Sequence, residues 1–417
     1  MTDSPVRRKH TRRQRAFLFF NIGLAVVTML AGTGLLYANW KLGNRQVVTI
    51  DAAAQGDGNL DLPEGDRTAK NFLITGSDNN ACISKDSPFY GGFSNRAGYG
   101  ERSDSLMVVR VNPIDNQAAI LSFPRDMWVK QAGSNRSNRI NANFEKKNPN
   151  RLIRNLKENF GITIDHYINI DFCAFAAIVD AVGGVRVPFT YKAQDKMTGF
   201  KVLRARACFT FQGDHALAHM RSRHYKWFNP KTMKWTSDGT SDWGRISRQQ
   251  DFMKRVIRKS LEKAKTNPRV ASGILNAALK NIITDDNLTP LTVLQLGQAM
   301  KNFNTETMGS YTMPGTGQVI DDMSVIVPDL ESATSKKILA VFQGKASLKT
   351  TISGASPATD VAVTTTTLAA IATTTTMAKS TPTTKAPASS TSTTVPSVAI
   401  EQSTRGIVPP NDANCQY

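Results

Sequence analysis

The chain has 417 residues, enough for one large domain or two ordinary ones with tails, so core size does not restrict the fold. Its formal net charge of +19 at pH 7 indicates a partner that carries phosphate, anionic lipid or an anionic polymer. Four cysteines (Cys82, Cys173, Cys208 and Cys415) are too few for a disulfide scaffold, and their spacing argues against a metal-thiolate site. Their pairing cannot be read from the sequence.

The N-terminus has the pattern of a membrane anchor. Residues 1–16 carry six Lys or Arg and one acid, and no charged residue occurs between Ala16 and Trp40. A cleaved signal peptide usually has an apolar core of about 7 to 15 residues. This run is longer and closes with Tyr37 and Trp40, which favours an uncleaved span. We therefore expect a basic cytoplasmic tail (1–16), one transmembrane helix (17–40) and a single-pass protein of the cell membrane whose remaining residues are extracellular.

A polar stretch at 41–68 has the composition of an extracellular stalk, and ordered structure is expected from 69 to 345. The apolar patterns at residues 71–75 and 105–111 predict buried strands. The strand predicted at 117–123 follows a turn-rich loop at 112–116, so it should pair with 105–111 in an antiparallel manner.

Helical patterns follow at 149–160 and 171–182, and strands at 166–170 and 185–189 flank the second of these helices. Further helices are expected at 214–220, 245–265, 268–282 and 290–303, with a closing strand and helix within 308–342. This alternation predicts a three-layer α/β or α+β domain around one sheet. Beyond Ala346 the sequence is rich in Thr, Ser, Ala and Pro, which predicts a disordered tail (346–417).

Two aspartates lie at predicted strand ends. Asp78 follows the first strand in ITGSD, and Asp104 precedes the second in ERSDSL. Carboxylates that share a cation with substrate phosphate suit Mg²⁺. Each aspartate taken alone could equally be a turn or capping residue.

Arginines gather at predicted element ends. Between residues 201 and 260 there are 14 Lys or Arg against 4 Asp or Glu. Arg221 and Arg223 are two apart, so they can act together only at or beyond a helix end. Arg245, Arg248 and Gln249 share one helical face. A solvated basic face is the alternative, but arginine at element ends suits bidentate binding of phosphate.

We find no GxSxG nucleophile motif and no P-loop. His215 and His219 stand four apart in HALAH, but Ala216 occupies the position where a zinc-binding HExxH helix needs its glutamate. We expect partly exposed helix histidines here.

The ordered motifs resemble the LytR-CpsA-Psr family, in the family's order over about 185 residues. The matching stretches are NFLITGSD (71–78), ERSDSLMVVRVNP (101–113), AAILSFPRDMWV (118–129), RINANF (139–144), IDHYINIDFCAFAAIVDAVGGVRV (164–187), FQGDHALAHMRSRH (211–224) and DWGRISRQQDFM (242–253). The cysteine contexts and the Thr-rich tail look most like the actinobacterial branch. Two departures are Asn79-Asn80, where many members have an Arg, and FPRD in place of IPRD.

The resemblance implies a three-layer α/β/α domain with a central mixed sheet and a groove for a polyprenyl chain. It implies a phosphotransferase that moves a glycopolymer from a polyprenyl (decaprenyl or undecaprenyl) pyrophosphate carrier to peptidoglycan. Asp78 and Asp104 match the family's residues for Mg²⁺ (or Mn²⁺), and Asp104, Arg102 and Arg125 are the expected catalytic group. The expected pyrophosphate ligands are Arg102, Arg125, Arg221, Arg223, Arg245 and Gln249.

Three alternatives stay open at this stage. A pyrophosphatase would use water in place of the wall hydroxyl, and a non-catalytic wall-binding protein would use the same arginines to hold anionic polymer. A membrane-bound transcriptional regulator is disfavoured, because about 16 cytoplasmic residues are too few for a folded DNA-binding module, and we expect no nucleic-acid partner. The sequence does not identify the polymer, which could be arabinogalactan, a teichoic-type chain or a capsular glycan.

Overall fold

A seven-stranded sheet forms the centre of the protein in the computed structural model, which describes residues 46–51, 69–77, 82–90, 103–266, 282–289, 292, 296, 299–300, 302–348, 396–402 and 404–415. The strands lie in the order β1-β14-β7-β2-β3-β4-β15. Their bounds are β1 Gln46–Val48, β2 Lys70–Ser77, β3 Ser103–Asn112, β4 Gln117–Phe123, β7 His166–Asp171, β14 Ile282–Asp285 and β15 Gly309–Thr312.

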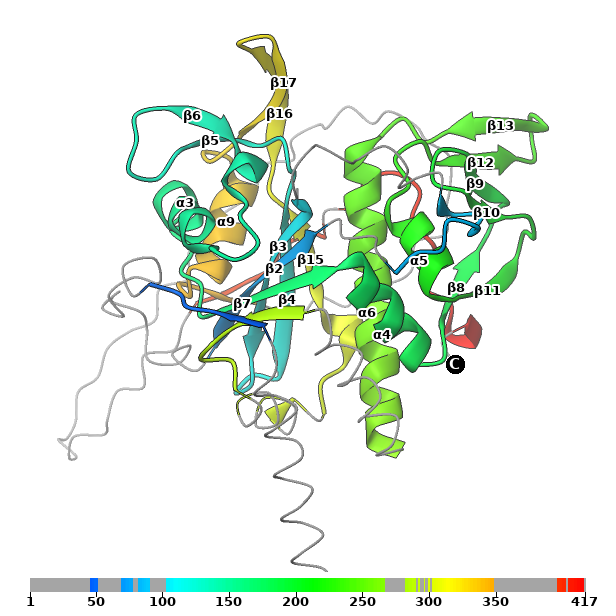
Figure 1. The fold of residues 1–417 in the computed structure, drawn as a ribbon, viewed down its shortest axis with the longest axis horizontal. Helices are drawn as coiled ribbons and strands as arrows, with labels where there is room; N and C mark the ends of the chain where they lie inside the picture. The colour runs from blue at the N-terminus through cyan, green and yellow to red at the C-terminus, as the bar shows by residue number, and fades with distance from the viewer. Residues whose placement is uncertain are drawn as a thin grey trace, which may run out of the picture.

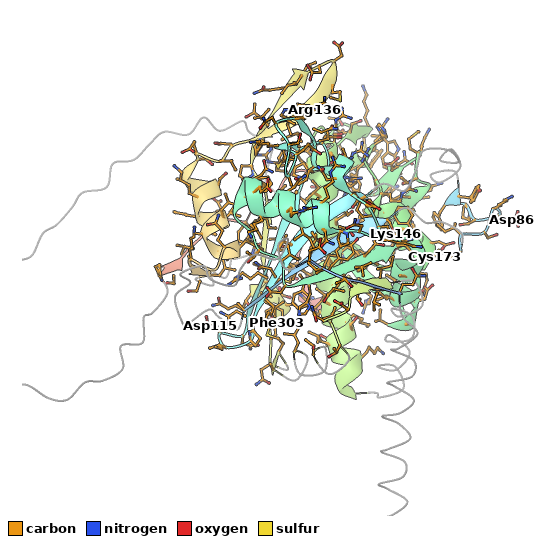
Figure 2. All side chains as sticks on the ribbon, turned by 60° about the vertical axis from the view of Figure 1, so that its left-hand side comes forward. Asp86, Asp115, Arg136, Lys146, Cys173 and Phe303 are labelled. Atoms are coloured by element: carbon orange, nitrogen blue, oxygen red, sulfur yellow. A yellow bond between two sulfur atoms is a disulfide. The ribbon has the colours of Figure 1, made fainter. Side chains whose placement is uncertain are left out.

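Both strand directions occur in this sheet. β3 is antiparallel to β2 and to β4, whereas β7 runs parallel to β2 and β15 parallel to β4. The predicted antiparallel pair and the central mixed sheet are therefore confirmed. Asp115, in the β3–β4 turn, and Phe303, which precedes β15, both lie at the lower end of the molecule in Figure 2. The ends of β2 and β4 and the start of β3 consequently meet at the opposite edge.

Both faces of the sheet are buried, because successive side chains of a strand point to opposite faces. One face packs against α3 (Asn150–Phe160) and α9 (Ala333–Phe342), and the other against α6 (Asp242–Thr266). Figure 1 shows these helices on the two sides of the sheet, which gives three layers. Alternate residues divide between the two cores: Leu73, Leu106, Val108 and Leu121 in the first, Phe72, Met107, Val109 and Ile120 in the second.

A smaller unit packs against the α6 side of the sheet. It contains α4 (Phe172–Ala181), α5 (Gly213–Met220) and the strand pair β8 (Val185–Phe189) and β11 (Ala207–Phe211). A four-stranded sheet in the order β10-β9-β12-β13 completes it. These strands are β9 Ala193–Asp195, β10 Phe200–Val202, β12 Lys226–Asn229 and β13 Lys234–Ser237.

Short elements lie at the periphery. Two hairpins pair β5 (Trp128–Lys130) with β6 (Ser137–Arg139) and β16 (Gly315–Ile320) with β17 (Met323–Pro328). The 3-10 turns are η3 Ile140–Asn143, η4 Thr305–Thr307 and η5 Ala413–Cys415. β18 (Ser347–Leu348) pairs in parallel with β19 (Ser397–Val398).

Two domain boundaries need correction. The predicted stalk at 41–68 contributes β1 to the central sheet, because Val48 and Ile50 are apolar enough to join its core. The Thr-rich composition of residues 346–417 predicts a disordered tail. Its residues 396–402 and 404–415 instead pack on the domain, and a disulfide joins Cys415 to Cys208.

Two predicted helices fall mostly outside the described residues. Of the helix predicted at 268–282, the structure describes Ile282 alone, which begins strand β14. Of the helix predicted at 290–303, the described residues at positions 292, 296 and 299 are helical. The predicted transmembrane span at 17–40 also lies outside, and within the described ranges no helix is long and apolar enough to cross a bilayer.

His215 and His219 of α5 lie in an aromatic core. Phe200, Phe211 and Phe252 surround the buried His219 ring, with centroid distances of 4.8, 5.1 and 6.0 Å. Burial lowers the pKa of His215 to about 4 and, together with the nearby Arg248, lowers the pKa of His219 well below its usual value. The half-buried His215 agrees with the prediction of partly exposed helix histidines, whereas that prediction is wrong for His219, which the aromatic core buries to 1% exposure.

Arg248 ties the smaller unit to α6. This side chain is 1% exposed; it donates to Asp238 Oδ2 at 2.7 Å and to the Ser222 carbonyl at 3.0 Å, and its guanidinium lies 4.3 Å from the Tyr225 ring centroid. Burial opposes ionisation of Asp238, but hydrogen bonds from Thr240 and Arg248 hold its pKa below the usual value. The pair is therefore ionised at neutral pH.

We predict that Arg248→Met lowers the free energy of unfolding by about 3–5 kcal/mol, because it leaves the Asp238 carboxylate buried without its cation. Urea denaturation measures this. The control is Lys336→Met, which breaks the exposed ion pair with Glu331 and should change stability by less than about 1 kcal/mol. Equal effects of the two substitutions would contradict the assignment.

The buried histidines predict an acid-sensitive fold. Below about pH 6.5 these histidines bind protons in the unfolded chain but stay neutral in the folded one. The free energy of unfolding therefore falls as the pH drops. His219→Phe should flatten this dependence between pH 7 and pH 5 by about 1 kcal/mol per pH unit, whereas His224→Gln, at an exposed position, should leave it unchanged. An unaltered slope in His219→Phe would refute the role of this ring.

Candidate active site

Four strands end or begin at one edge of the central sheet. Ser77, the last residue of β2, pairs with Asp171 of β7 and with Ser103 of β3, and Leu106 of β3 pairs with Phe123 at the end of β4. The pairing of β2 with β3 shifts here, since Gly76 faces Ser105 and Ser77 faces Ser103. Asp104 is thus the extra residue of a β-bulge, a feature that re-aims backbone beside functional sites.

Only some of the predicted catalytic and metal-binding residues lie in the described part of this edge. The backbone of Asp104 lies in β3 at the edge, and Arg125 follows β4 by two residues. Asp78, which comes next after β2, and Arg102, which directly precedes β3, lie outside the described residues, as does the side chain of Asp104. The part of the chain that the structure describes contains no group of three or more His, Cys, Asp or Glu residues able to hold a metal.

A buried polar network fixes the backbone beneath this edge. Ser77 Oγ donates to Asn169 Oδ1 at 3.0 Å, and Asn169 Nδ2 donates to Thr75 Oγ1 at 2.9 Å. Thr75 Oγ1 donates in turn to the Tyr167 hydroxyl at 3.1 Å. All four residues are fully or almost fully buried, and such satisfied networks are rigid. The backbone at the end of β2 is therefore held in a fixed position.

A cavity of about 630 Å³, counting the open space at its mouth, lies between this part of the sheet and helices α4, α5 and α6. Its wall is mainly apolar. The apolar lining residues are Ile74, Met107, Ile170, Phe172, Phe175, Leu217, Met220 and Met253. Apolar lining with a few convergent polar groups is typical of a ligand site.

Three of the predicted pyrophosphate ligands line this cavity: Arg221, Arg245 and Gln249. Arg221 caps the C-terminal end of α5, as its spacing from Arg223 required, and its guanidinium lies 5.0 Å from the ring centroid of Phe172. The aromatic face stabilises the cation through its quadrupole. Arg221 and Arg245 therefore bring positive charge to an otherwise apolar cavity.

One carboxylate gathers two of the arginines. Asp242 Oδ1 lies 3.1 Å from Arg223 Nε and 3.0 Å from Arg245 Nη2. Asp242 stands in the first turn of α6, where a negative charge is also favoured by the helix dipole. Arg223 and Arg245, 22 positions apart in the sequence, are thereby held side by side.

The helical face predicted to carry Arg245, Arg248 and Gln249 divides in two. Arg245 and Gln249 line the cavity, whereas Arg248 points away from it and forms the buried ion pair with Asp238. Gln249 Nε2 donates to the Met220 carbonyl at 3.0 Å and so satisfies a free acceptor at the end of α5. That bond holds α5 against α6 at the level of Arg221.

Arg125 forms an ion pair with its neighbour Asp126. Its Nε lies 3.3 Å from Asp126 Oδ2, and Asp126 also pairs with Arg139 at 3.5 Å. Arg125 does not belong to the lining of the cavity, although β4 brings it to the same edge of the sheet. Its expected role in phosphate binding stays a prediction.

The sequence reading missed the residues that shape the cavity. Asp171 lines it and also caps α4, since its Oδ1 accepts from the Ala174 N–H at 2.7 Å. A disulfide joins Cys173, two residues later, to Cys82, which fixes the segment after β2 against the start of α4. The signal for Asp171 was its position between the strand predicted at 166–170 and the helix that follows it. The apolar wall residues carry no signal that distinguishes them from core.

Comparisons with known proteins agree with this arrangement. The sequence model described as the LytR_cpsA_psr family matches residues 41–340. TagV of Bacillus subtilis is 25% identical over 338 residues, which is 79% of this chain and 78% of the relative. TagU of Bacillus cereus is 28% identical over 234 residues, 55% of this chain and 69% of the relative. Both are named polyisoprenyl-teichoic acid–peptidoglycan teichoic acid transferases.

The fold also matches a solved structure. The LytR-Csp2A-Psr enzyme from Actinomyces oris superposes with a TM-score of 0.51 at 21% identity, over 72% of this chain and 96% of that one. At this identity the likeness supports the α/β fold with its mixed central sheet.

Proposed function

Because the chain belongs to the LytR-CpsA-Psr family, we propose that it is a phosphotransferase that moves a glycopolymer from a polyprenyl pyrophosphate carrier to peptidoglycan. The names of its relatives support a polyisoprenyl-linked donor and a peptidoglycan acceptor. The observation that carries the proposal is the cavity, whose long apolar wall adjoins Arg221 and Arg245. An amphiphile with an apolar tail and an anionic head satisfies both parts of this chamber.

The cavity suits the two parts of such a donor. Polyprenyl units would bury their hydrocarbon against the wall residues of α4, α5 and the sheet, at a gain of about 25 cal/mol per Å² of apolar surface. Guanidinium groups bind phosphate oxygens through paired N–H donors. Arg221 and Arg245, with Arg223 held beside Arg245 by Asp242, would bind the pyrophosphate at the head of the chain.

The reaction replaces a phosphoanhydride bond of the donor with a phosphoester bond to the acceptor. A hydroxyl of the acceptor attacks the phosphorus that carries the glycan, the new P–O bond forms, and the bond to the polyprenyl phosphate breaks. The arginines stabilise the charge that develops on the leaving phosphate. Asp104, which the bulge places at this edge, would take the hydroxyl proton, and Arg102 and Arg125 would complete the phosphate contacts. Positioning and electrostatics supply most of the rate in such transfers.

Asp78 and Asp104 would hold Mg²⁺ or Mn²⁺. The bulge places Asp104 opposite the end of β2, and Asp78 is the next residue in the sequence. Two carboxylates fit a hard cation whose other ligands are water and phosphate oxygen. The cation would neutralise pyrophosphate charge when bound.

An exported, membrane-anchored location accompanies this function. Two disulfides, Cys82–Cys173 and Cys208–Cys415, suit an oxidising compartment outside the cytoplasm. The uncharged stretch from Ala16 to Trp40 would hold the domain at the membrane, where lipid-linked donors reside.

We predict that Asp104→Asn and Arg125→Ala each lower transfer by about 100-fold or more, because each removes a group at the reacting phosphate. The assay follows covalent attachment of a lipid-linked glycan to peptidoglycan, which also separates transfer from hydrolysis by water. Arg136→Ala, at an exposed position of the β5–β6 hairpin, is the matched control and should retain full activity. Full activity of Asp104→Asn would refute its role.

We predict that Met253→Trp reduces copurified polyprenyl phosphate by about tenfold, because the indole would fill part of the cavity that the lipid needs. Mass spectrometry of extracted lipid measures this. Val319→Trp, on the exposed β16–β17 hairpin, adds the same bulk elsewhere and should leave lipid content unchanged. Retention of lipid by Met253→Trp would place the tail outside this cavity.

A further inference from the structure

The β12–β13 hairpin rises from the mouth of the cavity. β12 begins three residues after Arg223, and β13 ends five residues before Asp242, the carboxylate that pairs with Arg223 and Arg245. The base of the hairpin is closed by the Asp238 N–H, which donates to the Tyr225 carbonyl at 2.8 Å. Arg248 fastens this base to α6 one turn beyond Arg245. The base of the hairpin is therefore fixed to α6, the helix that carries Arg245.

The sheet to which the hairpin belongs has one buried face. Ala193 of β9 pairs with Val202 of β10, and Asp195 pairs with Phe200, so these four side chains share a face. All four are buried, and Asp195 accepts a hydrogen bond from Ser222 Oγ at 2.8 Å. Figure 1 shows this sheet at the side of α5, with β13 at its margin.

The alternate residues form the other face, which we call the outer face. Pairings of Lys201 and Lys226 with Gln194, of Phe228 with Trp235, and of Lys226 with Ser237 define it. Lys192, which precedes β9, joins it through its ammonium group, 5.5 Å from the Phe228 ring centroid. The outer face consists of Lys192, Gln194, Lys201, Lys226, Phe228, Trp235 and Ser237.

This face has an unusual composition for a solvated surface. Phe228 and Trp235 form an edge-on aromatic pair with centroids 5.7 Å apart, and Trp235 is 36% exposed. Lys192, Lys201 and Lys226 are exposed around the pair, and none of the outer-face residues is acidic. Partly exposed aromatic rings within a one-signed field of charge mark a binding surface.

We propose that the outer face binds the peptidoglycan acceptor and presents its hydroxyl to the cavity mouth. Aromatic rings stack on the C–H faces of sugars, and the Gln194 amide and Ser237 hydroxyl suit sugar hydroxyl and acetamido groups. The lysines complement the carboxylates of the stem peptides. This inference rests on the proposed function, which requires such an acceptor.

The position of the face favours the acceptor over other occupants. The cavity and its arginines already account for the lipid and pyrophosphate of the donor, whereas the acceptor needs a surface outside the mouth. A lipid surface would engage apolar side chains without hydrogen-bonding partners, but here neutral polar groups alternate with the aromatic pair. Attachment through Arg248 keeps the bound glycan at a constant distance from Arg245.

Sacculus binding by the full-length protein tests the proposal without any donor. Purified peptidoglycan sacculi are sedimented with the protein in detergent, and the bound fraction is titrated. We expect Trp235→Ala and Lys226→Ala each to weaken binding by about tenfold. Lys234→Ala is the matched control, because Lys234 lies on the same hairpin but pairs with Asn229 on the opposite face, and its binding should equal wild type. Thermal unfolding verifies that each variant is folded.

Kinetics give a second measure. Trp235→Ala should raise the KM for peptidoglycan about tenfold while kcat and the KM for the lipid donor stay within about twofold. Wild-type sacculus affinity in both Trp235→Ala and Lys226→Ala would overturn the proposal. Quenching of wild-type fluorescence by brominated lipids in nanodiscs, lost in Trp235→Ala, would also overturn it in favour of a membrane contact. A wild-type protein that binds sacculi but transfers nothing would refute the proposed function instead.

Discussion

Like-charged guanidinium groups repel, yet Arg221, Arg223 and Arg245 converge beside an apolar chamber where water screens them poorly. The structure offsets this repulsion locally. Asp242 forms ion pairs with two of the three and cancels one of their positive charges, and the Phe172 ring stabilises the third through its negative face. The net charge that remains is positive, so an anionic head group would complete the site rather than disturb it. The contacts of Asp242 on α6 and of the Phe172 ring hold these cations together.

The central sheet brings the ends of several strands to one edge. β2, β3 and β4 alternate in direction, so the end of one and the start of the next meet at a single edge. A bulge at Asp104 breaks the regular alternation there, and the polar network of Thr75, Ser77 and Asn169 keeps the neighbouring backbone rigid. This edge of the sheet and the cavity share Gly76 and Ser105.

Local patterns predicted most elements because they depend on nearby residues. The strand at 117–123 and the helix at 150–160 follow directly from apolar spacing and turn formers. The packing of β1 and of residues 396–402 and 404–415 could not be predicted, because it depends on partners that are between 50 and 237 positions away in the sequence. The same holds for the site: the family resemblance pointed to Arg221, Arg245 and Gln249, which line the cavity, but the apolar wall looks like any core in sequence. Arg248 shared their helical face and still turned away, since Asp238 offered a buried carboxylate.

The C-terminal segment closes the chain on itself. β18 and β19 pair in parallel, and the Cys208–Cys415 disulfide fastens the far end to β11, so the Thr-rich stretch between residues 348 and 397 begins and ends on the same domain. That stretch consequently lies within the covalent loop that the Cys208–Cys415 disulfide closes. A protease that cuts within it would leave both pieces in one molecule until the disulfide is reduced, so the domain would tolerate nicking by wall-associated proteases without shedding its C-terminus.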